Sequence, residues 1–481
     1  MRPHPAIAFA ERSSLDPPVR LGMSISQTIF RQYDVRGIVG TDLTDEVAYG
    51  IGRGYATLLA QRGISGAVAV GRDNRPSGAA LRDALVLGLT ECGVDVVDVG
   101  VVPTPLLYWA LHHEHVVGGI QITGSHNPPE YNGFKMCLGT ASLHGEDIQT
   151  LYGYIIAGEH PAGQGTVRDA DVIDRYVHDI ATRVGPIARP DGSRMKVVYD
   201  CGNGAAALVA PQLFAALGLD AIGLFTESDG TFPNHHPDPT VPENLEACIA
   251  AVREHGAELG VAFDGDADRI GVVDANGRII WGDHLLILYA RDVLARTGAG
   301  QPIIFDVKCS QALTDGIEQA GGTAVMWKTG HSLIKDKMKA MQAPIAGEMS
   351  GHMFFTEGFY GHDDALYAAA RLLRIVADSG KRIDDLLSDV PHFVSTPEIR
   401  IDTDDATKFA IMSKAVPHFS SLYDVIDVDG VRVLFGDGWG LLRASNTQPV
   451  IVARYEARSE ARLAEIREVM ESWVREQGVA L

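Results

Sequence analysis

The chain has 481 residues, of which 46% are hydrophobic and 21% charged, so it can bury the cores of about three ordinary globular domains. Its formal net charge of −21 argues against nucleic acids and anionic membranes as partners, and an anionic substrate would need a local basic pocket. Five scattered cysteines without a C-x-x-C pair argue against disulfides and zinc and favour a cytoplasmic protein, and no apolar run reaches the roughly 18 residues of a membrane span.

The first 25 residues contain four prolines and lack the apolar centre of a signal peptide. We expect a flexible extension there. Beyond it, strand-like runs that lead into polar turns begin at residues 67, 196 and 302. Stretches of helical period follow, as in Ala80–Leu89 and Ala207–Leu217. This repetition predicts three similar α/β domains.

A serine follows the predicted strand Val116–Ile122 in a turn rich in Gly, Asn and Pro. Ser125 is flanked by His126, and Lys135 lies ten residues further on. The carboxyl ends of strands are where open α/β sheets place their chemistry. An ordinary turn serine is the alternative, whereas the hydrolase motif G-x-S-x-G fails because residue 127 is Asn.

Three carboxylates at alternate positions follow the apolar residues 259–262: Asp264, Asp266 and Asp268. They repel one another unless a cation lies among them, and oxygen ligands suit Mg²⁺. An EF-hand loop is excluded because its sixth and twelfth positions would be Arg269 and Ala275. A solvated acidic turn is the remaining alternative.

Two further polar segments carry weaker signals. One contains Glu348, Ser350 and His352, and the other, after the predicted strand 431–435, clusters groups that suit phosphate oxygens: Arg443, Ser445, Asn446 and Thr447. A strand at 450–455 and a helix at 460–473 should follow. We interpret the histidines of 112–115 as the end of a helix and His235 and His236 as loop residues, rather than as metal ligands.

These motifs, together with residues 30–38 and 328–332, occur in the order found in the α-D-phosphohexomutases. The chain most resembles the bacterial phosphomannomutase/phosphoglucomutase group, from about Phe30 to Tyr455. The resemblance implies four domains around a central cleft: three similar mixed-sheet α/β domains and a smaller α+β C-terminal domain. We place them at residues 26–170, 171–276, 277–392 and 393–481.

The resemblance also implies the roles of individual residues. Ser125 would be phosphorylated in the resting enzyme and, with the three aspartates, would hold one Mg²⁺ per chain. Catalytic roles would fall to Ser125, His126, Lys135, Arg269 and His352. Substrate contacts would come from Tyr33, Arg36, Lys308, His331, Glu348, Ser350, Arg443, Ser445, Asn446 and Thr447.

The implied reaction is reversible phosphoryl transfer between the 1- and 6-positions of mannose or glucose phosphates, with a hexose 1,6-bisphosphate as intermediate and activator. A phosphoglucosamine mutase, an Mg²⁺-dependent sugar phosphatase and a non-enzymatic sugar-phosphate sensor are the alternatives. Intact Ser125, Lys135 and aspartates argue against the sensor. We expect hexose phosphates as partners, and a monomer or weak homo-oligomer.

Overall fold

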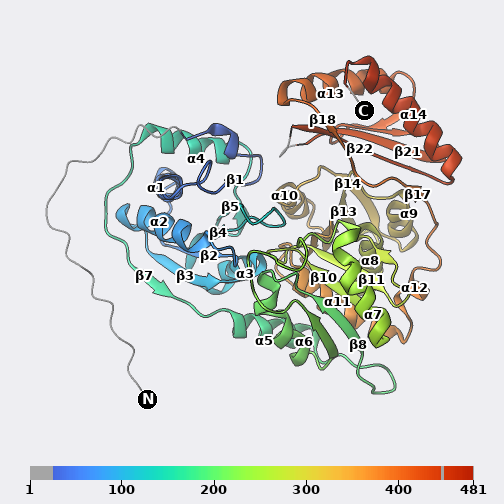
Figure 1. The fold of residues 1–481 in the computed structure, drawn as a ribbon, viewed down its shortest axis with the longest axis horizontal. Coiled ribbons are helices and arrows are strands. Elements are labelled where there is room, and N and C mark those ends of the chain that lie inside the picture. Colours follow the sequence, from blue (N-terminus) through green and yellow to red (C-terminus); the bar gives the residue numbers. More distant parts are fainter. Residues whose placement is uncertain (1–24, 446–448, 480–481) are drawn as a thin grey trace.

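The computed structural model describes residues 25–445 and 449–479, which form four sheets covered by helices (Figure 1). The predicted N-terminal extension at residues 1–25 lies almost wholly outside the described residues. Each of the first three sheets contains parallel strands joined by helical crossovers, and each ends in an antiparallel pair. The predicted architecture of three mixed-sheet domains and a different C-terminal one is confirmed.

The first domain is built on a seven-stranded sheet of order β1-β5-β4-β2-β3-β7, with β6 paired to β5. In β2, Val68 and Val70 pack against helices α1, α2 and α4, whereas Ala69 packs against α3. Because side chains alternate along a strand, helices cover both faces of the sheet. The elements are η1 (Gln27–Ile29), β1 (Val35–Ile38), α1 (Asp45–Gln61), β2 (Ala67–Arg72), α2 (Gly78–Glu91), β3 (Val96–Val101), α3 (Thr104–His113), β4 (Val116–Ile122), β5 (Tyr131–Leu138), β6 (Ala141–Ser142), α4 (Glu146–Ala157) and β7 (Val167–Asp169).

The second domain has a five-stranded sheet of order β12-β11-β10-β8-β9. Its elements are α5 (Ile173–Val184), β8 (Lys196–Asp200), η2 (Ala205–Leu208), α6 (Ala210–Ala216), β9 (Asp220–Leu224), η3 (Pro242–Leu245), α7 (Glu246–His255), β10 (Leu259–Phe263), β11 (Ile270–Asp274) and β12 (Ile279–Ile280). The continuous helix expected over 207–217 is instead a 3₁₀ turn followed by α6. Pro211 lies in the first turn of α6, where its missing N–H is tolerated, so the α-helix begins only at residue 210. Strand β12 follows the boundary predicted at 276, yet it pairs with β11 of the second sheet.

The third domain has a four-stranded sheet of order β14-β13-β15-β16. Its elements are α8 (Gly282–Thr297), β13 (Pro302–Asp306), α9 (Gln311–Gln319), β14 (Thr323–Trp327), α10 (His331–Met341), β15 (Ile345–Gly347), β16 (Met353–Phe355), α11 (Ala365–Ser379) and α12 (Ile383–Leu386). One continuous hydrophobic core runs from α3 through the second domain to α11 and α12. The first three domains are therefore packed together over a large shared interior.

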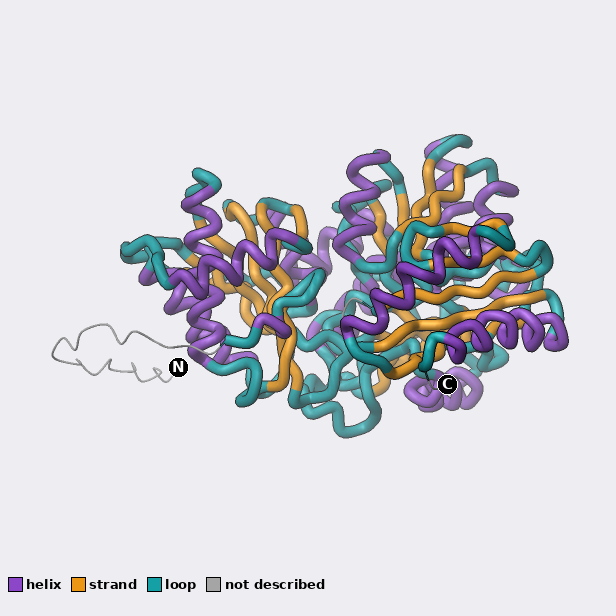
Figure 2. Tube along the Cα trace, turned by 90° about the horizontal axis from the view of Figure 1, so that it is seen from above, coloured by secondary structure: helices purple, strands orange, loops and turns teal. Residues whose placement is uncertain are grey.

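The C-terminal domain is a six-stranded antiparallel sheet with α13 and α14 packed against it. It appears in orange and red in Figure 1, and Figure 2 shows its strands and long helices from above. Its elements are β17 (Val394–Ser395), β18 (Ile399–Asp402), α13 (Asp405–Ser420), β19 (Asp424–Ile426), β20 (Val431–Leu434), β21 (Gly438–Ala444), β22 (Val450–Ala457) and α14 (Glu460–Glu476). Among the described residues, a small cluster of Val307, Trp439 and Leu441 joins its apolar residues to the third domain.

The predicted strands at 67, 116, 196, 259, 302, 431 and 450 are all present, as is the C-terminal helix. Helix α3 ends at His113, as expected for the histidine run. All five cysteines are free and buried. Within the described residues, no helix combines the length and apolarity that crossing a membrane requires.

Candidate active site

The loop between β4 and β5 holds Ser125 in an unusual backbone conformation. Its φ of 49° lies in the left-handed region, which costs a non-glycine residue on the order of 1 kcal/mol or more. Arg75, wholly buried, donates to four backbone carbonyls of this loop, at Ser125, Asn127, Pro128 and Tyr131. Asp73 accepts from the Arg75 guanidinium and from the backbone N–H of Gly124. The loop is therefore held in a fixed shape by an internal ion pair.

The acidic loop between β10 and β11 lies directly against this serine. A Cβ atom at Gly265 would lie 2.4 Å from the carbonyl oxygen of Ser125, so only glycine permits the approach. The Ser125 hydroxyl donates to Asp264 Oδ2 at 3.2 Å. The other oxygen of Asp264 accepts the backbone N–H groups of Asp268 and Arg269, which fixes the turn. The serine and the acidic loop thus form one site between the first two domains.

The three predicted aspartates are fully buried, and one oxygen from each lies within 4.8 Å of the others. The Oδ1 atoms of Asp266 and Asp268 have no hydrogen-bond partner among the described residues. Burial, and then repulsion from Asp268 and Asp266, raises the pKa of Asp264 well above its ordinary value. Buried, unpaired carboxylate oxygens around one point are what a divalent cation would satisfy, so these residues fit Mg²⁺.

Lys135 on β5 occupies the opposite side of the acidic loop. Its ammonium group donates to Asp266 Oδ2 at 2.9 Å and also pairs with Asp268. Burial alone would lower the pKa of Lys135, but these carboxylates raise it above its ordinary value. Thr104 and Thr123 donate their hydroxyls to Asp266 Oδ2 as well. Lys135 is therefore held against the acidic loop whose Asp264 contacts Ser125.

Two histidines and an arginine complete this region. His126 Nδ1 lies 3.1 Å from the Ser125 hydroxyl, and burial, followed by the nearby Arg269, lowers its pKa well below the ordinary value. Arg269 donates from Nε to Nε2 of His352 at 3.0 Å. A bridge between the backbones of Arg269 and His352 fixes the third domain against the acidic loop. The five predicted catalytic residues therefore come together in one place.

The loop that contains Glu348, Ser350 and His352 follows β15. Glu348 accepts the backbone N–H of Gly330 at 2.6 Å and the Ser350 hydroxyl at 3.2 Å, and burial raises the pKa of its carboxyl group. The imidazole of His331 stacks near that of His352, with ring centroids 5.8 Å apart. Tyr33 of the first domain reaches across to donate to the carbonyl of Thr329 at 2.7 Å. The first and third domains therefore bring together four predicted substrate residues: Tyr33, His331, Glu348 and Ser350.

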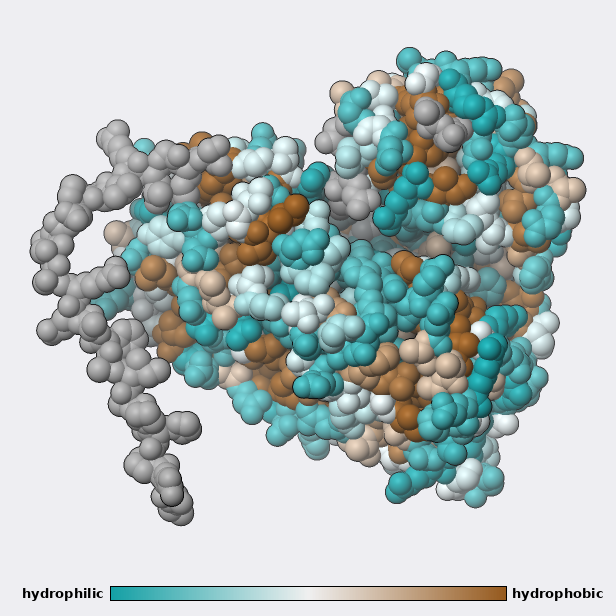
Figure 3. Space-filling model, in the orientation of Figure 1, coloured by the Kyte–Doolittle hydropathy of each residue, from teal (hydrophilic) through white to brown (hydrophobic). Residues whose placement is uncertain are grey.

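The predicted phosphate clamp lies on β21 of the C-terminal domain. Arg443 Nε donates to Asp429 at 2.9 Å, and the same Asp429 oxygen accepts the backbone N–H of Thr329 at 3.1 Å. Ser445 is buried at the end of this strand. Asn446 and Thr447 lie outside the described residues. In Figure 3 the surface is notched between the C-terminal domain and the first domain.

The two remaining predicted contacts are Arg36 and Lys308. Arg36 donates to Asn127 and to the carbonyl of Gly124 in the serine loop, at 2.8 and 3.3 Å. Lys308 pairs with Glu398, just before β18, at 3.3 Å. Arg36 therefore contacts the serine loop, whereas Lys308 contacts the C-terminal domain that carries the clamp.

Several residues that shape the site escaped the sequence analysis. They are Asp73, Arg75, Thr104, Lys335, Asp363, Glu398 and Asp429. Only the polar turn at residues 72–77, which follows a predicted strand, gave a local signal. The others act through contacts between distant segments.

Family models match the sequence of this chain in all four domains. The descriptions of the matching models are phosphoglucomutase/phosphomannomutase, alpha/beta/alpha domain I over residues 27–160, domain II over 174–277, domain III over 281–393, and the C-terminal domain over 398–472. A phosphomannomutase/phosphoglucomutase of Pseudomonas putida is 49% identical over 93% of this chain and 95% of its own length. A phosphoglucomutase of Neisseria gonorrhoeae is 46% identical over 92% of this chain and 96% of its own.

Solved structures of similar proteins have the same fold as this chain. A phosphoglucomutase/phosphomannomutase family protein from Burkholderia thailandensis is 45% identical, covers 94% of this chain and 98% of its own, and superimposes with a TM-score of 0.87. A putative phosphomannomutase from Thermus thermophilus shares the fold at 23% identity and a TM-score of 0.76, over 96% of this chain and 100% of its own. The chain belongs to the phosphoglucomutase/phosphomannomutase family, as its motifs and their order predicted.

Proposed function

We propose that this enzyme interconverts hexose 1-phosphate and hexose 6-phosphate, with mannose and glucose as its sugars. The observation that carries the proposal is the Ser125 hydroxyl, which lies 3.2 Å from Asp264 at the edge of three buried carboxylates. A serine held this way can accept and return a phosphoryl group. The names of relatives near 49% identity support the same reaction and both sugars.

The catalytic cycle would begin with phosphorylated Ser125. Its phosphoryl group passes to a free hydroxyl of the bound sugar phosphate, which gives a 1,6-bisphosphate. The intermediate turns around, and its other phosphate returns to Ser125. Because the sugar hydroxyl must lose a proton in the first step and regain one in the last, a group near the serine has to exchange protons. Lys135, His126 and His352 surround that position.

Asp264, Asp266 and Asp268, with Ser125, would hold one Mg²⁺. When bound, this ion would neutralise charge on the transferring phosphoryl group. Arg269 lies beside the same loop and can contact the phosphoryl oxygens as a charge-assisted donor. Lys135 keeps Asp266 and Asp268 in place while it remains protonated.

The far end of the substrate would be bound by the clamp of Arg443, Ser445, Asn446 and Thr447. A phosphate group is nearly symmetric, so one such site serves the 1-phosphate and the 6-phosphate alike. Glu348, Ser350, His331 and Tyr33 lie on the loops between the clamp and the serine and would contact the sugar, with Arg36 near the serine and Lys308 near the clamp. This division of tasks explains why the predicted substrate contacts come from the first, third and C-terminal domains, while the second domain supplies the predicted aspartate ligands of the metal.

Product analysis tests the proposal. Mannose 1-phosphate, glucose 1-phosphate and glucosamine 1-phosphate should be assayed side by side with Mg²⁺ and a trace of hexose 1,6-bisphosphate. We expect 6-phosphates of mannose and glucose, formed without stoichiometric inorganic phosphate. Release of free phosphate would indicate a sugar phosphatase, and preferred turnover of the glucosamine substrate would indicate a phosphoglucosamine mutase.

The same proposal includes the hexose bisphosphate as activator, because any enzyme that loses its phosphoryl group needs a donor to restore phosphoserine. A monomer or weak homo-oligomer, and a cytoplasmic location, stay predictions. Gel filtration with light scattering tests the first, and cell fractionation the second.

A further inference from the structure

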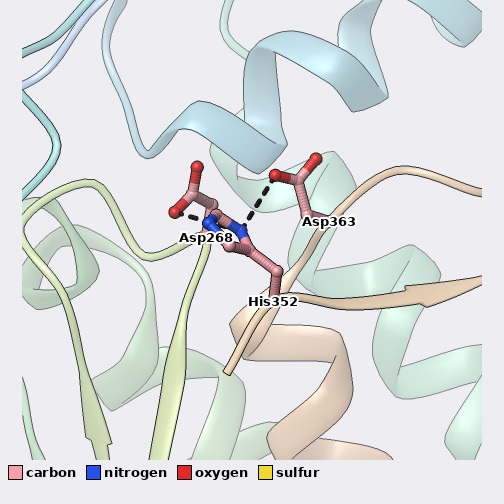
Figure 4. Close-up of side chains that lie close together, drawn as sticks. All are labelled: Asp268, His352 and Asp363. Carbon is pink, nitrogen blue, oxygen red and sulfur yellow. Dashed lines mark ion pairs between the residues drawn. The ribbon is translucent and has the colours of Figure 1, made fainter. Parts of the chain in front are cut away.

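A buried carboxylate outside the predicted site faces the active-site histidine. Asp363 lies one residue before the N-cap of α11, in the loop after β16, and it is completely buried. Its Oδ2 atom lies 3.1 Å from Nδ1 of His352 and 3.8 Å from Nδ1 of His331. Figure 4 shows Asp363 and Asp268 approaching the His352 ring from two sides. The proposed catalytic cycle assigns no role to Asp363.

The opposite nitrogen of His352 fixes which tautomer the ring adopts. Arg269 donates from Nε to His352 Nε2 at 3.0 Å. A guanidinium group has only donors, so Nε2 must be the nitrogen that carries no proton. In a neutral imidazole the proton is then on Nδ1, which faces Asp363.

Asp363 is better placed than Asp268 to accept a hydrogen bond from the Nδ1–H group of His352. Asp268 Oδ1 lies further from Nδ1, at 3.6 Å, and its other oxygen pairs with Lys135. Burial would raise the pKa of Asp363, but Lys335, 3.1 Å away, and the two histidines hold it well below its ordinary value. Asp363 Oδ2 and His352 Nδ1 lie 3.1 Å apart, and neither atom has a hydrogen-bond partner elsewhere among the described residues.

We propose that Asp363 is a positioning residue that holds His352 as the Nδ1–H tautomer, with Nε2 free to take a proton from the sugar hydroxyl. This inference rests on the proposed function. A phosphoryl group near Arg269 would compete for the guanidinium and uncover Nε2. The sugar O–H bond then breaks with its proton on Nε2, the oxygen forms the new O–P bond, and the P–O bond to Ser125 breaks with its electron pair on the serine oxygen. Asp363 stabilises the resulting imidazolium.

A purely structural role for Asp363 is the competing explanation. Lys335 pairs with Asp363 and lies 4.3 Å from the centre of the Tyr108 ring, so the carboxylate also joins the first and third domains. The two explanations differ in one respect. A residue that acts through His352 loses its importance when His352 is absent, whereas a structural residue does not.

The test is a double-mutant cycle with Asp363→Asn and His352→Ala. In the wild-type background we expect Asp363→Asn to lower kcat about 10- to 100-fold with KM nearly unchanged, as for other carboxylates that orient a histidine. In the His352→Ala background it should have almost no further effect. Equal losses in both backgrounds would overturn the proposal.

Asp364→Asn is the matched control. Asp364 is the neighbouring buried aspartate, but its carboxylate accepts the Tyr176 hydroxyl and caps α11 at Tyr367. This variant should lower the melting temperature while leaving kcat of the folded enzyme near that of wild type. An equal fall in kcat for both aspartate variants would assign the effect to structure.

A second measurement does not depend on the variants or on turnover. Nitrogen-15 NMR of histidine-labelled wild-type enzyme reports which ring nitrogen of His352 carries the proton, with His352→Ala assigning the signal. We expect the Nδ1–H tautomer, and an Nε2–H tautomer would overturn the proposal even if Asp363→Asn does not fold. Failure of the proposed function would be recognised separately, as absence of hexose 6-phosphate from the wild-type enzyme.

Discussion

The two ends of the active site are built in different ways. At the serine end, one hydrophobic core continues from α3 of the first domain through the second and third domains, and Ser125, Lys135 and the acidic loop are buried. At the clamp end, the C-terminal domain has a core of its own and meets the third domain through a small apolar cluster. Arg432 adds to this junction by stacking on Trp439 and donating to the carbonyls of Val307 and Cys309.

This difference indicates that the serine end carries out the chemistry and the clamp end binds the substrate. The serine end has fixed geometry, which suits a reaction that depends on position and charge. The C-terminal domain meets the third domain through individual polar contacts, such as the ion pair of Glu398 with Lys308. Within the clamp, Arg443 pairs with Asp429, and a phosphate group can replace that partner. We therefore expect the C-terminal domain to move on the other three when substrate binds.

Replacing the serine should have the largest effect. Ser125→Ala should abolish mutase turnover, because it removes the hydroxyl that accepts and returns the phosphoryl group. After incubation with a hexose 1,6-bisphosphate, the mass of the intact wild-type protein should rise by one phosphate, and that of the variant should not. Alanine and serine are similarly strained at a positive φ, so the melting temperature should change little. Full turnover by this variant would refute a phosphoserine mechanism.

Weakening the acidic loop should have the next largest effect. Asp266→Asn removes a charge from the carboxylate cluster, so half-maximal activity should require far more Mg²⁺, and chelation should stop the wild-type enzyme. Asp274→Asn is a matched control, since Asp274 is also buried but contacts its own turn, where it accepts backbone N–H groups and pairs with Arg278. Activity that survives exhaustive chelation would show that the loop does not hold a required metal.

The clamp should show an intermediate effect. A charge-assisted hydrogen bond is worth about 1.5 to 3 kcal/mol, so Arg443→Ala should lower kcat/KM about 10- to 150-fold. Because one clamp serves both orientations, the forward and reverse reactions should suffer alike, and more free phosphate should be lost per turnover. Arg462→Ala, an exposed arginine of the same domain that pairs with Asp437, should change neither quantity. A loss in one direction only would assign Arg443 to a single-orientation site.

The two ends also differ in how far sequence alone predicts them. Strands such as β4 and β8 were predicted at their exact bounds because an apolar run followed by a polar turn is a local signal. The serine and the aspartates could be found because each motif lies within one loop. By contrast, Asp363 acts on His352 from another loop of the third domain, and Asp429 contacts Arg443 of its own domain and Thr329 of the third. No local pattern distinguishes these two residues from other loop aspartates. The split of α6 was missed because its apolar period continues through the turn before Pro211.

The smallest expected effect concerns the contact between the clamp domain and the third domain. Glu398 pairs with Lys308, and this positive charge lowers the pKa of its carboxyl group from 4.5 to about 2 despite partial burial. A carboxyl group whose pKa is depressed on folding stabilises the folded state when ionised. Its contribution is therefore complete above the unfolded pKa of 4.5 and declines as the pH falls toward 2.

We therefore expect the free energy of unfolding to differ between wild type and Glu398→Gln by a constant amount above about pH 5. The difference should shrink below that pH, over the range in which the protein remains folded. Denaturant titrations at a series of pH values measure it, and the glutamine keeps the size of the side chain. A difference independent of pH would mean that Glu398 acts through packing. The clamp domain would then be attached by shape rather than by exchangeable charge, which would remove the main reason to expect it to move.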